Sequence, residues 1–342
     1  MSKSKIVILN WNGEQHLKRF LPSVVRSVEG VEGCSVVVAD NGSTDDSLAL
    51  LERDFPSVEV VRLDRNYGFA EGYNRALQTI QADYYILLNS DVETPRGWVE
   101  PLIQCLDNCP KVAACAPKLR FSEARDQFEY AGAAGGYIDF LGYPFCRGRV
   151  LRAIEKDEGQ YDDARDLFWV SGAAYCCRAE LFHRMGGFDG DYFAHMEEID
   201  LSWRLQLAGW KIRIVPESKV YHYGGGTLST DSPRKIFLNH RNNLAMLFKC
   251  GTPIQCLVAL LLRPGLDCLA ALTYLAQGHT ENFKAVFRAW WEVIGWYPML
   301  KEKRRKVREC ASAEGYRYIY RGSILWQYLI GRRKAGELNL PK

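Results

Sequence analysis

Short apolar runs that alternate with helical patterns constrain the fold of this chain more than any other feature of its sequence. The runs and the helical patterns between them fall, in chain order, at residues 5–9, 14–28, 35–39, 47–53, 58–63, 68–80 and 84–88. The runs lack polar alternation, which is typical of strands that are buried on both faces of a sheet. The pattern therefore predicts an α/β fold, with a mostly parallel sheet covered by helices on both faces.

Polar residues follow each of the four runs, at the edge where parallel sheets bind their ligands. In chain order they are Asn10, Asn12, Asp40, Asn41, Asn66, Asn89, Ser90 and Asp91. Asp40 is placed to accept hydrogen bonds from a nucleoside base or ribose, although Asp is also a common turn residue at such a strand end. Gly68, at the start of the third helical pattern, would let backbone amides approach a ligand.

The second half of the chain is less regular. Strands are expected at residues 112–117 and 168–176, and two short ones at 210–215 and 219–222. Residues 122–166 are rich in Gly, Asp, Glu and Arg, and we expect them to form a long excursion that acts as a lid or binding loop.

The composition restricts the class of protein. The 342 residues are 47% hydrophobic and 25% charged, as in ordinary globular proteins, which excludes disordered and fibrous chains. The net charge of +3 is too small to indicate a nucleic-acid partner. The 11 cysteines show no zinc-type spacing, so we expect free thiols in a reducing compartment. No apolar signal core follows the N-terminus, so we do not expect secretion.

Two nucleotide-binding motifs are absent from the sequence. The spacing G-x-x-x-x-G-K does not occur, and G-x-G-x-x-G does not follow the first strand. These absences argue against a P-loop protein and against a nicotinamide or flavin enzyme.

Carboxylates and one histidine are the candidate chemical groups. Glu197, Glu198 and Asp200 fall within four positions at the start of a predicted helix, where acids favour the helix dipole or, in a cleft, supply a general base. Asp91 ends a buried strand, where it could hold Mg²⁺ or Mn²⁺ or cap the following turn. His222 closes another strand ahead of three glycines, and it is either structural or a metal ligand.

Six segments, in order over residues 5 to about 245, resemble those of the family 2 glycosyltransferases, the inverting class with the GT-A fold. The resemblance is strongest to the rhamnosyltransferase-like branch of bacterial surface-polysaccharide enzymes. The segments are Val7–Asn12, Val38–Asp45, Asn66–Ala70 with Asn74, Leu87–Asp91, Glu197–Asp200, and His222 with the glycines after it. Two positions depart from the family pattern: Asn89 replaces the first Asp of the D-x-D metal motif, and Glu198 replaces the usual Asp of the acceptor motif.

The resemblance implies a nucleotide-diphospho-sugar transferase fold with a Rossmann-like sheet, and a catalytic domain at residues 1–249. Its donor half, about 1–117, would bind a nucleoside-diphosphate sugar, and its acceptor half, about 118–249, a glycan or lipid-linked glycan. The donor would contact Asn10, Asn12, Asp40, Asn41, Asn66, Gly68, Asn74, Asn89 and Ser90. The acceptor would contact Trp169, Gly172 and Ala173, whose alternative interpretation is a core strand with a close approach at the glycine.

The resemblance also implies the roles of the charged groups. Asp91 and His222 would hold the Mg²⁺ or Mn²⁺ that neutralises the leaving diphosphate, and Glu198 would take the proton of the acceptor hydroxyl. Which of Glu197, Glu198 and Asp200 is the base stays open. Such an enzyme, with rhamnose as the candidate sugar, would work in the cytoplasm or on the cytoplasmic face of the inner membrane.

The C-terminal region, residues 250–342, lies mostly outside the resemblance. From Asn282 to the end it holds 14 Lys and Arg against 5 Asp and Glu. We expect helices here, and tryptophans beside a basic run favour the surface of an anionic membrane. The alternative is an appendage that packs on the catalytic domain or forms a homodimer. A simple membrane span is not expected, because residues 263–267 interrupt the most apolar stretch.

Two other classes compete with this interpretation. A nucleotidyltransferase on a related sheet should carry a Gly-rich, basic loop after the first strand, where this chain has Asn10–Gly13. A non-catalytic sugar-nucleotide-binding protein would have no need of Asp91 and Glu198.

Overall fold

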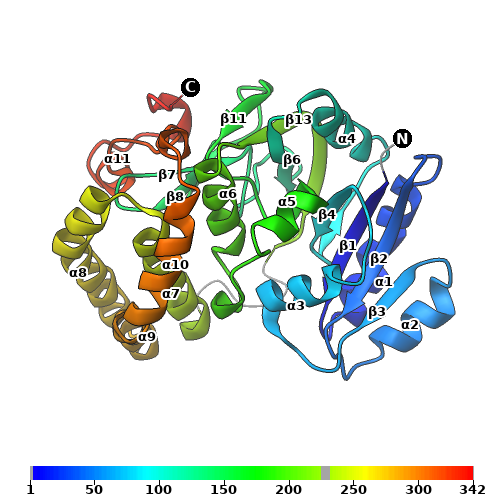
Figure 1. Ribbon diagram of the computed structural model, residues 1–342, viewed down its shortest axis with the longest axis horizontal. Coiled ribbons are helices and arrows are strands. Elements are labelled where there is room, and N and C mark those ends of the chain that lie inside the picture. The colour runs from blue at the N-terminus through cyan, green and yellow to red at the C-terminus, as the bar shows by residue number, and fades with distance from the viewer. Residues whose placement is uncertain (1–2, 225–231, 342) are drawn as a thin grey trace.

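A single mixed sheet runs through the molecule (Figure 1). The computed structural model describes residues 3–224 and 232–341. In the described part the sheet has nine strands in the order β11-β13-β6-β12-β4-β1-β2-β3, and β5 pairs with β13. The strands are β1 (Ser4–Asn10), β2 (Cys34–Asp40), β3 (Glu59–Arg62), β4 (Tyr84–Leu88), β5 (Val92–Glu93), β6 (Val112–Phe121), β11 (Arg165–Leu167), β12 (Ala174–Arg178) and β13 (Lys211–His222).

The strands predicted in the first third of the chain are confirmed. β4, β1, β2 and β3 are parallel neighbours, and β6 is parallel to β13, whereas β12 runs antiparallel to both β4 and β6. The two short strands expected before His222 are one strand, β13, with an irregularity between Val215 and Lys219. The sheet is therefore mostly parallel, as the apolar runs indicated.

Helices cover both faces of the sheet, because successive strand residues point to opposite sides. Val7 packs in one core with α3 (Gly68–Leu77), α5 (Ala179–Arg184) and α6 (Glu197–Leu207). Ile6 and Ile8 pack in the other core with α1 (Glu14–Ser27), α2 (Ser47–Asp54) and α4 (Val99–Asn108). A 3₁₀ turn, η1 (Gly190–Tyr192), precedes α6. The polar ends of β1, β2 and β4 thus project from mostly buried strands, whereas β3 is exposed or half-buried along its length.

The excursion at residues 122–166 is more ordered than we expected. It contains a small antiparallel sheet of the strands β7 (Gly136–Ile138), β8 (Pro144–Cys146), β9 (Arg149–Val150) and β10 (Ala153–Ile154). Phe128 and Phe145 are buried there, and the buried Lys118 of β6 pairs with Asp157 over 2.8 Å. An apolar core and a buried ion pair, which composition alone did not indicate, hold this segment in place.

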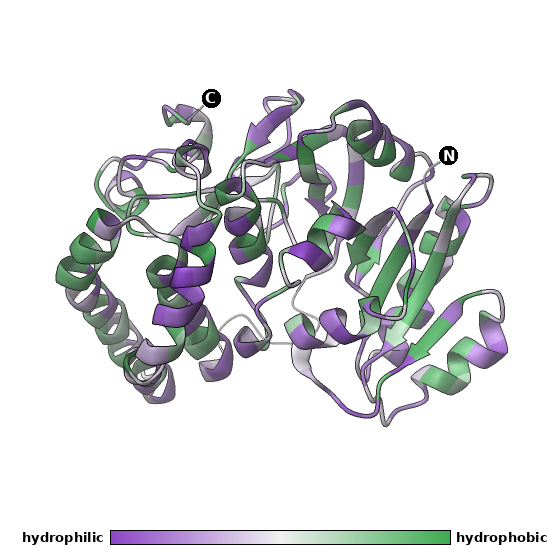
Figure 2. Cartoon of the chain, in the orientation of Figure 1, coloured by the Kyte–Doolittle hydropathy of each residue, from purple (hydrophilic) through white to green (hydrophobic). Residues whose placement is uncertain are grey.

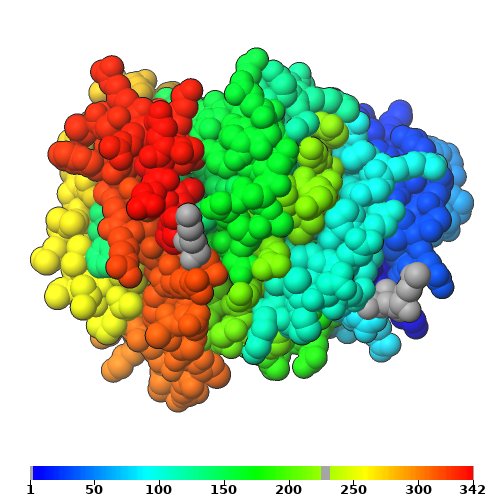
Figure 3. Space-filling model, turned by 90° about the horizontal axis from the view of Figure 1, so that it is seen from above, coloured from blue at the N-terminus to red at the C-terminus, as the bar shows by residue number. Residues whose placement is uncertain are grey.

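Helices form most of the C-terminal region and pack directly against the middle of the chain (Figure 3). α7 contacts α6, α9 and α10, and it contributes Leu244 to the main core. A second, small core lies among α7, α8 and α9, around Ile236, Ala271 and Val286. The elements are α7 (Pro233–Cys250), α8 (Pro253–Ala276), α9 (Thr280–Gly295), α10 (Tyr297–Glu309), η2 (Ala313–Tyr316), α11 (Ile324–Leu329) and η3 (Ala335–Glu337).

Residues 263–267 interrupt the apolar sequence but not the backbone, because α8 runs through them as one helix. Arg263 and Asp267 lie four residues apart on the inward face, where Arg263 donates to Leu141 O over 2.9 Å and Asp267 accepts from the Trp290 indole over 2.9 Å. The outward face is apolar (Figure 2), and the helix has the length and composition of a membrane span. In the fold, however, its polar residues attach it to the protein.

Candidate active site

Asn10 and Asp40 lie next to each other at the ends of β1 and β2, where the strand register pairs them. Asn10 Nδ2 donates to Asp40 Oδ1 over 3.3 Å, and Asp40 Oδ2 accepts from the Ser43 amide over 3.0 Å. Asn12 Oδ1 accepts from the Thr44 amide over 2.7 Å. Asn10 Oδ1 is buried without a hydrogen-bond partner in the described residues, so this edge keeps one free acceptor.

A second asparagine network joins the ends of β2 and β3 to α3. Asn41 Nδ2 donates to Asn66 Oδ1 over 3.1 Å and to Gly68 O over 2.9 Å. Gly68 has φ of +81°, and a Cβ there would lie 2.5 Å from the Phe193 ring, so the fold requires glycine. The network sets the shape of the donor edge by linking loops that are far apart in sequence.

The start of α3 does not present its amides to a ligand, which corrects the expectation for this loop. The amides of Phe69 and Ala70 both donate to Phe193 O, over 2.6 and 3.1 Å. Asn74 is also used structurally, because its amide group makes two hydrogen bonds of 2.9 Å with the backbone of Phe188. α3 therefore holds the segment that leads to α6.

Asp91 and His222 come together although 131 positions separate them, because β5 pairs with the end of β13. Asp91 Oδ1 lies 3.1 Å from His222 Nε2, and Glu129 Oε1 lies 3.3 Å from His222 Nδ1. Burial lowers the pKa of His222, but the carboxylates of Glu129 and Asp91 outweigh burial and raise it to about 10. Gly225 and Gly226, two of the glycines after His222, lie outside the described residues.

The Asp91–His222 pair fits a divalent ion that takes further ligands from a substrate. It offers one carboxylate oxygen and one imidazole nitrogen, because His222 Nε2 lies 3.1 Å from Asp91 Oδ1. Within the described residues, no group of three or more His, Cys, Asp or Glu side chains is arranged to hold a metal ion by itself. Glu129, which the sequence did not reveal, faces the second imidazole nitrogen, as the carboxylate partners of metal-binding histidines do.

Glu197 and Glu198 open α6 and are set in a poorly solvated position. Burial raises the pKa of Glu198 to about 7, although backbone hydrogen bonds, including one from Gly172, oppose it. Burial raises the pKa of Glu197 further, and the neighbouring Glu198 adds to the effect. Glu197 Oε2 has no hydrogen-bond partner in the described residues. Glu198 is less buried than Glu197, and its pKa near neutrality is that of a working base.

Asp200 occupies a different environment from the two glutamates. It is fully buried, and its carboxylate pairs with Arg204 over 2.7 Å and with Lys249 over 2.6 Å. Lys249 also pairs with Asp189 over 2.5 Å, and Asp189 pairs with Lys303 of α10 over the same distance. This cluster joins α6, α7 and α10, so Asp200 has a structural task.

Gly172 and Ala173 lie between the metal candidates and the glutamates. The Asn89 amide donates to Ala173 O over 3.0 Å, and a Cβ on Gly172 would lie 3.5 Å from the Glu198 side chain. Ala173 and Gly172 thereby bring the end of β4, which leads to Asp91, close in space to Glu198. Trp169, in contrast, is 3% exposed and its indole donates to Tyr137 O over 3.0 Å, so its side chain belongs to the core.

The turn before α6 has an unusual backbone. φ is 65° at Phe193, 71° at His195 and 72° at Met196, although none of them is glycine. Asn242 of α7 holds this turn, because its Nδ2 atom donates to three carbonyls within residues 192–195 over 2.8 to 3.0 Å. Strain of this kind is common at functional sites. No sequence signal marked Asn242, because it lies on a helix outside the motifs.

Comparisons with known proteins identify the family of this chain. The family model described as Glycosyl transferase family 2 matches residues 5–165, and the one described as Glycosyl transferase family group 2 matches residues 154–277. An N-acetylglucosaminyl-diphospho-decaprenol L-rhamnosyltransferase of Mycobacterium tuberculosis is 27% identical over 259 residues, which cover 71% of this chain and 83% of the relative. The chain belongs to glycosyltransferase family 2.

Further similarities support the rhamnosyltransferase-like character of this glycosyltransferase. The rhamnosyltransferase WbbL of Escherichia coli is 26% identical over 227 residues, or 64% of this chain and 82% of WbbL. A mannosyltransferase from Pyrobaculum calidifontis, solved with GDP-Man and Mn²⁺, superimposes with a TM-score of 0.52 at 14% identity, over 90% of this chain and 85% of that one. The fold is GT-A, as the motifs implied. The chain is a glycosyltransferase, which excludes the nucleotidyltransferase and the non-catalytic binding protein considered from the sequence.

Proposed function

We propose that this family 2 enzyme transfers a sugar, with inversion, from a nucleoside-diphosphate sugar to a hydroxyl of a lipid-linked glycan during surface-polysaccharide synthesis. The observation that carries the proposal is Glu198, a carboxylate with a pKa of about 7 beside Gly172, on the edge that also carries the Asp91–His222 pair. Two of the relatives are named as rhamnosyltransferases, which favours rhamnose as the sugar. One of those names specifies an N-acetylglucosaminyl-diphospho lipid, which supports the lipid-linked acceptor.

In this mechanism Asp40, with the free acceptor Asn10 Oδ1, orients the nucleoside of the donor. Glu198 accepts the proton of the acceptor hydroxyl as that oxygen attacks the anomeric carbon. Asp91 and His222 would hold Mg²⁺ or Mn²⁺, which neutralises the charge of the departing diphosphate. Glu129 keeps the imidazole of His222 oriented, and Asn242 keeps the turn before Glu198 in its strained form. Asp200 is assigned to the ion-pair cluster, and Glu197 stays the alternative base.

A donor panel followed by one substitution tests the proposal. Nucleoside-diphosphate sugars should raise the melting temperature of the pure protein when Mg²⁺ or Mn²⁺ is present, and a chelator should remove this stabilisation. Glu198→Gln should keep donor binding and lower turnover by about 10²–10⁴-fold, the usual contribution of a general base.

The matched control is Glu180→Gln, an exposed glutamate at the start of α5. It should change neither donor binding nor turnover. Near-normal turnover in Glu198→Gln would assign the base to Glu197. Absence of stabilisation by every nucleotide sugar would contradict the proposed donor class.

We also propose that the enzyme works in the cytoplasm, on the inner face of the membrane that carries its acceptor. The support is the exposed apolar face of α8, where Leu257, Leu261 and Leu269 are 59%, 73% and 58% exposed. Apolar helix faces of this kind lie in the interfacial region of a bilayer.

A further inference from the structure

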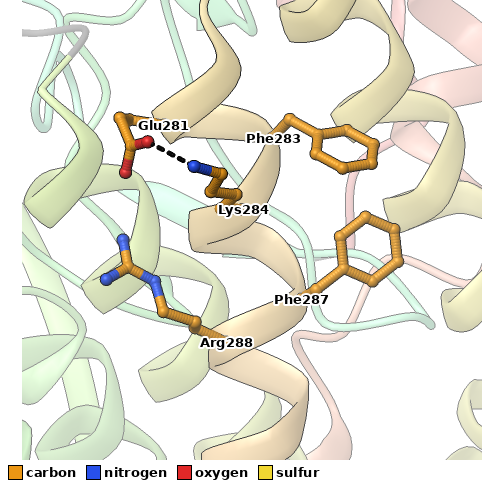
Figure 4. A pocket seen from close by; sticks show the side chains of 5 residues that line it. All are labelled: Glu281, Phe283, Lys284, Phe287 and Arg288. Atoms are coloured by element: carbon orange, nitrogen blue, oxygen red, sulfur yellow. Dashed lines mark hydrogen bonds and ion pairs between the residues drawn. The ribbon is translucent and has the colours of Figure 1, made fainter.

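A groove lies between α7 and α9. It has a volume of about 960 Å³, within the range of small-molecule sites, and its walls include Arg234 and Phe237 of α7 with Phe287, Arg288 and Trp291 of α9. A smaller hollow of about 550 Å³ on α9 shares Phe287 and Arg288 with it (Figure 4). Neither hollow belongs to the donor edge described above.

The groove carries uncompensated positive charge. In the part of the chain that the structure describes, the other charged groups nearby are paired: Lys284 with Glu281 and Arg241 with Glu292, each over 2.7 Å. Arg234 and Arg288 form no ion pair with a carboxylate among the described residues. Arg234 stacks on the Phe193 ring and Arg288 interacts with Glu281 at longer range. Two guanidinium groups on facing helices, neither of them in an ion pair among the described residues, complement a diphosphate, because guanidinium binds phosphate oxygens in a bidentate manner.

The groove is apolar as well as cationic. Phe287 and Trp291 are 44% and 80% exposed, a large aromatic surface to leave in water. Figure 4 shows Phe283 and Phe287 on one side of α9 and Lys284 and Arg288 on the other. α9 packs against α7 with one flank and against α8 with another, so the aromatic surface adjoins the helix whose leucines are exposed. A ligand suited to both properties has an anionic head and a hydrocarbon chain.

The cationic end of the groove is next to the candidate active site. The Arg234 guanidinium lies 4.6 Å from the centre of the Phe193 ring, and that ring abuts Gly68 at the donor edge. Phe193 begins the strained turn that leads directly to Glu197 and Glu198. An anion held by Arg234 therefore lies beside the turn that leads to the proposed base.

We propose that the α7–α9 groove binds the diphosphate and the first isoprenoid units of the lipid-linked acceptor. Arg234 and Arg288 bind the diphosphate, and Phe237, Phe287 and Trp291 contact the hydrocarbon. The chain then continues over α8 into the membrane, and the first sugar, on the other end of the diphosphate, points toward Glu198. This assignment rests on the proposed function, because it names the acceptor part of the same reaction.

Calorimetric titration with farnesyl diphosphate tests the groove without requiring turnover. Inorganic diphosphate, farnesol and phosphatidylglycerol vesicles serve as separate arms for charge alone, chain alone and a bulk anionic surface. We expect farnesyl diphosphate to bind at least tenfold more tightly than inorganic diphosphate or farnesol. The double variant Arg234→Gln/Arg288→Gln should lose at least tenfold in this affinity, and Phe287→Ser should lose severalfold.

The control variant is Arg332→Gln/Arg333→Gln, which removes two exposed arginines that follow α11. It should bind farnesyl diphosphate within twofold of the unmodified protein. Stabilisation by the donor nucleotide sugar should persist in all variants, because Arg234 and Arg288 are exposed and lie outside the donor edge.

Equal affinity in the groove variant and the control would overturn the proposal. So would vesicle binding that depends on Arg234 and Arg288 without binding of farnesyl diphosphate, because this result would assign the groove to bulk lipid. Failure of the proposed function has a different signature: farnesyl diphosphate binds, but no nucleotide sugar stabilises the protein. If a nucleotide sugar stabilises the protein and Glu198→Gln loses turnover, but farnesyl diphosphate does not bind, only the groove assignment fails.

Discussion

Burial at the start of α6 gives Glu198 a pKa of about 7, well above its ordinary value of 4.5. A general base works only when it is ionised, so kcat/KM should rise about tenfold per pH unit below pH 7 and level off above it. A pH–rate profile with saturating metal measures this midpoint. Glu180→Gln should leave the midpoint in place, and a midpoint near 4.5 would show that Glu198 is not the titrating base.

The same pKa shift has a consequence for stability. The folded-state pKa of Glu198 is above the unfolded value, so its contribution to stability is fully present below pH 4.5 and is lost as the pH rises through 7. Glu198→Gln, which removes the ionisation, should therefore raise the melting temperature at pH 8 and leave it unchanged at pH 4. A lower melting temperature at both values would mean that the carboxylate is structurally required.

At the scale of single elements, α3 is held by its first residue. Gly68→Ala should destabilise the fold by roughly 2–4 kcal/mol, because it adds left-handed strain and a contact 2.5 Å from the Phe193 ring. Turnover should also fall, since Phe193 begins the turn before the proposed base. Chemical denaturation and a turnover assay measure the two effects.

Gly97→Ala is the matched control for that substitution. Gly97 has φ of +80°, nearly the same backbone strain, but no atom lies within 4 Å of the added Cβ. We expect a loss of about 1–2 kcal/mol and normal turnover. If the two variants lost stability equally and both stayed fully active, Phe193 would have no role in positioning α6.

At the scale of the whole molecule, α8 has one face attached to the protein and one exposed apolar face, which supports the proposed membrane contact. Its charged residues Arg263 and Asp267 are 1% exposed and bonded to the protein, and its outward leucines are free. A spanning orientation would break those internal bonds and place both charges in lipid. The helix therefore fits an in-plane, interfacial position, with the active site held near the surface.

Vesicle flotation measures this contact. The full chain should float with phosphatidylglycerol vesicles, and Leu257→Ser/Leu261→Ser/Leu269→Ser should reduce the bound fraction at least fivefold, because each removes exposed apolar area that lipid would cover. Ile154→Ser, at an exposed isoleucine of β10, is the control and should float normally. Unchanged flotation of the triple variant, together with a change from dimer to monomer, would assign the face to self-association.

The sequence alone was sufficient for the parallel strands of the first third of the chain and for the motifs at their ends. It was less reliable further on, because the strand expected at residues 168–176 begins only at Ala174. Strands such as β1 and β2 are apolar on both faces, so local composition identifies them, and their ends necessarily meet at one edge. Asp40, Asp91 and Glu198 could be located because short motifs surround them. The helical nature of the C-terminal region was also readable, from periodicity.

Only the tertiary structure decided which of these residues meet and what each can do. Glu129 faces His222, Asn242 holds the turn before Glu198, and Lys249 neutralises Asp200, across separations of 47 to 93 positions that no local pattern encodes. Burial, which depends on every packed neighbour, raises the pKa of Glu198, whereas ion pairs with Arg204 and Lys249 give Asp200 a structural role. For the same reason α8 is continuous, since its two inward charges find partners that only the folded chain supplies.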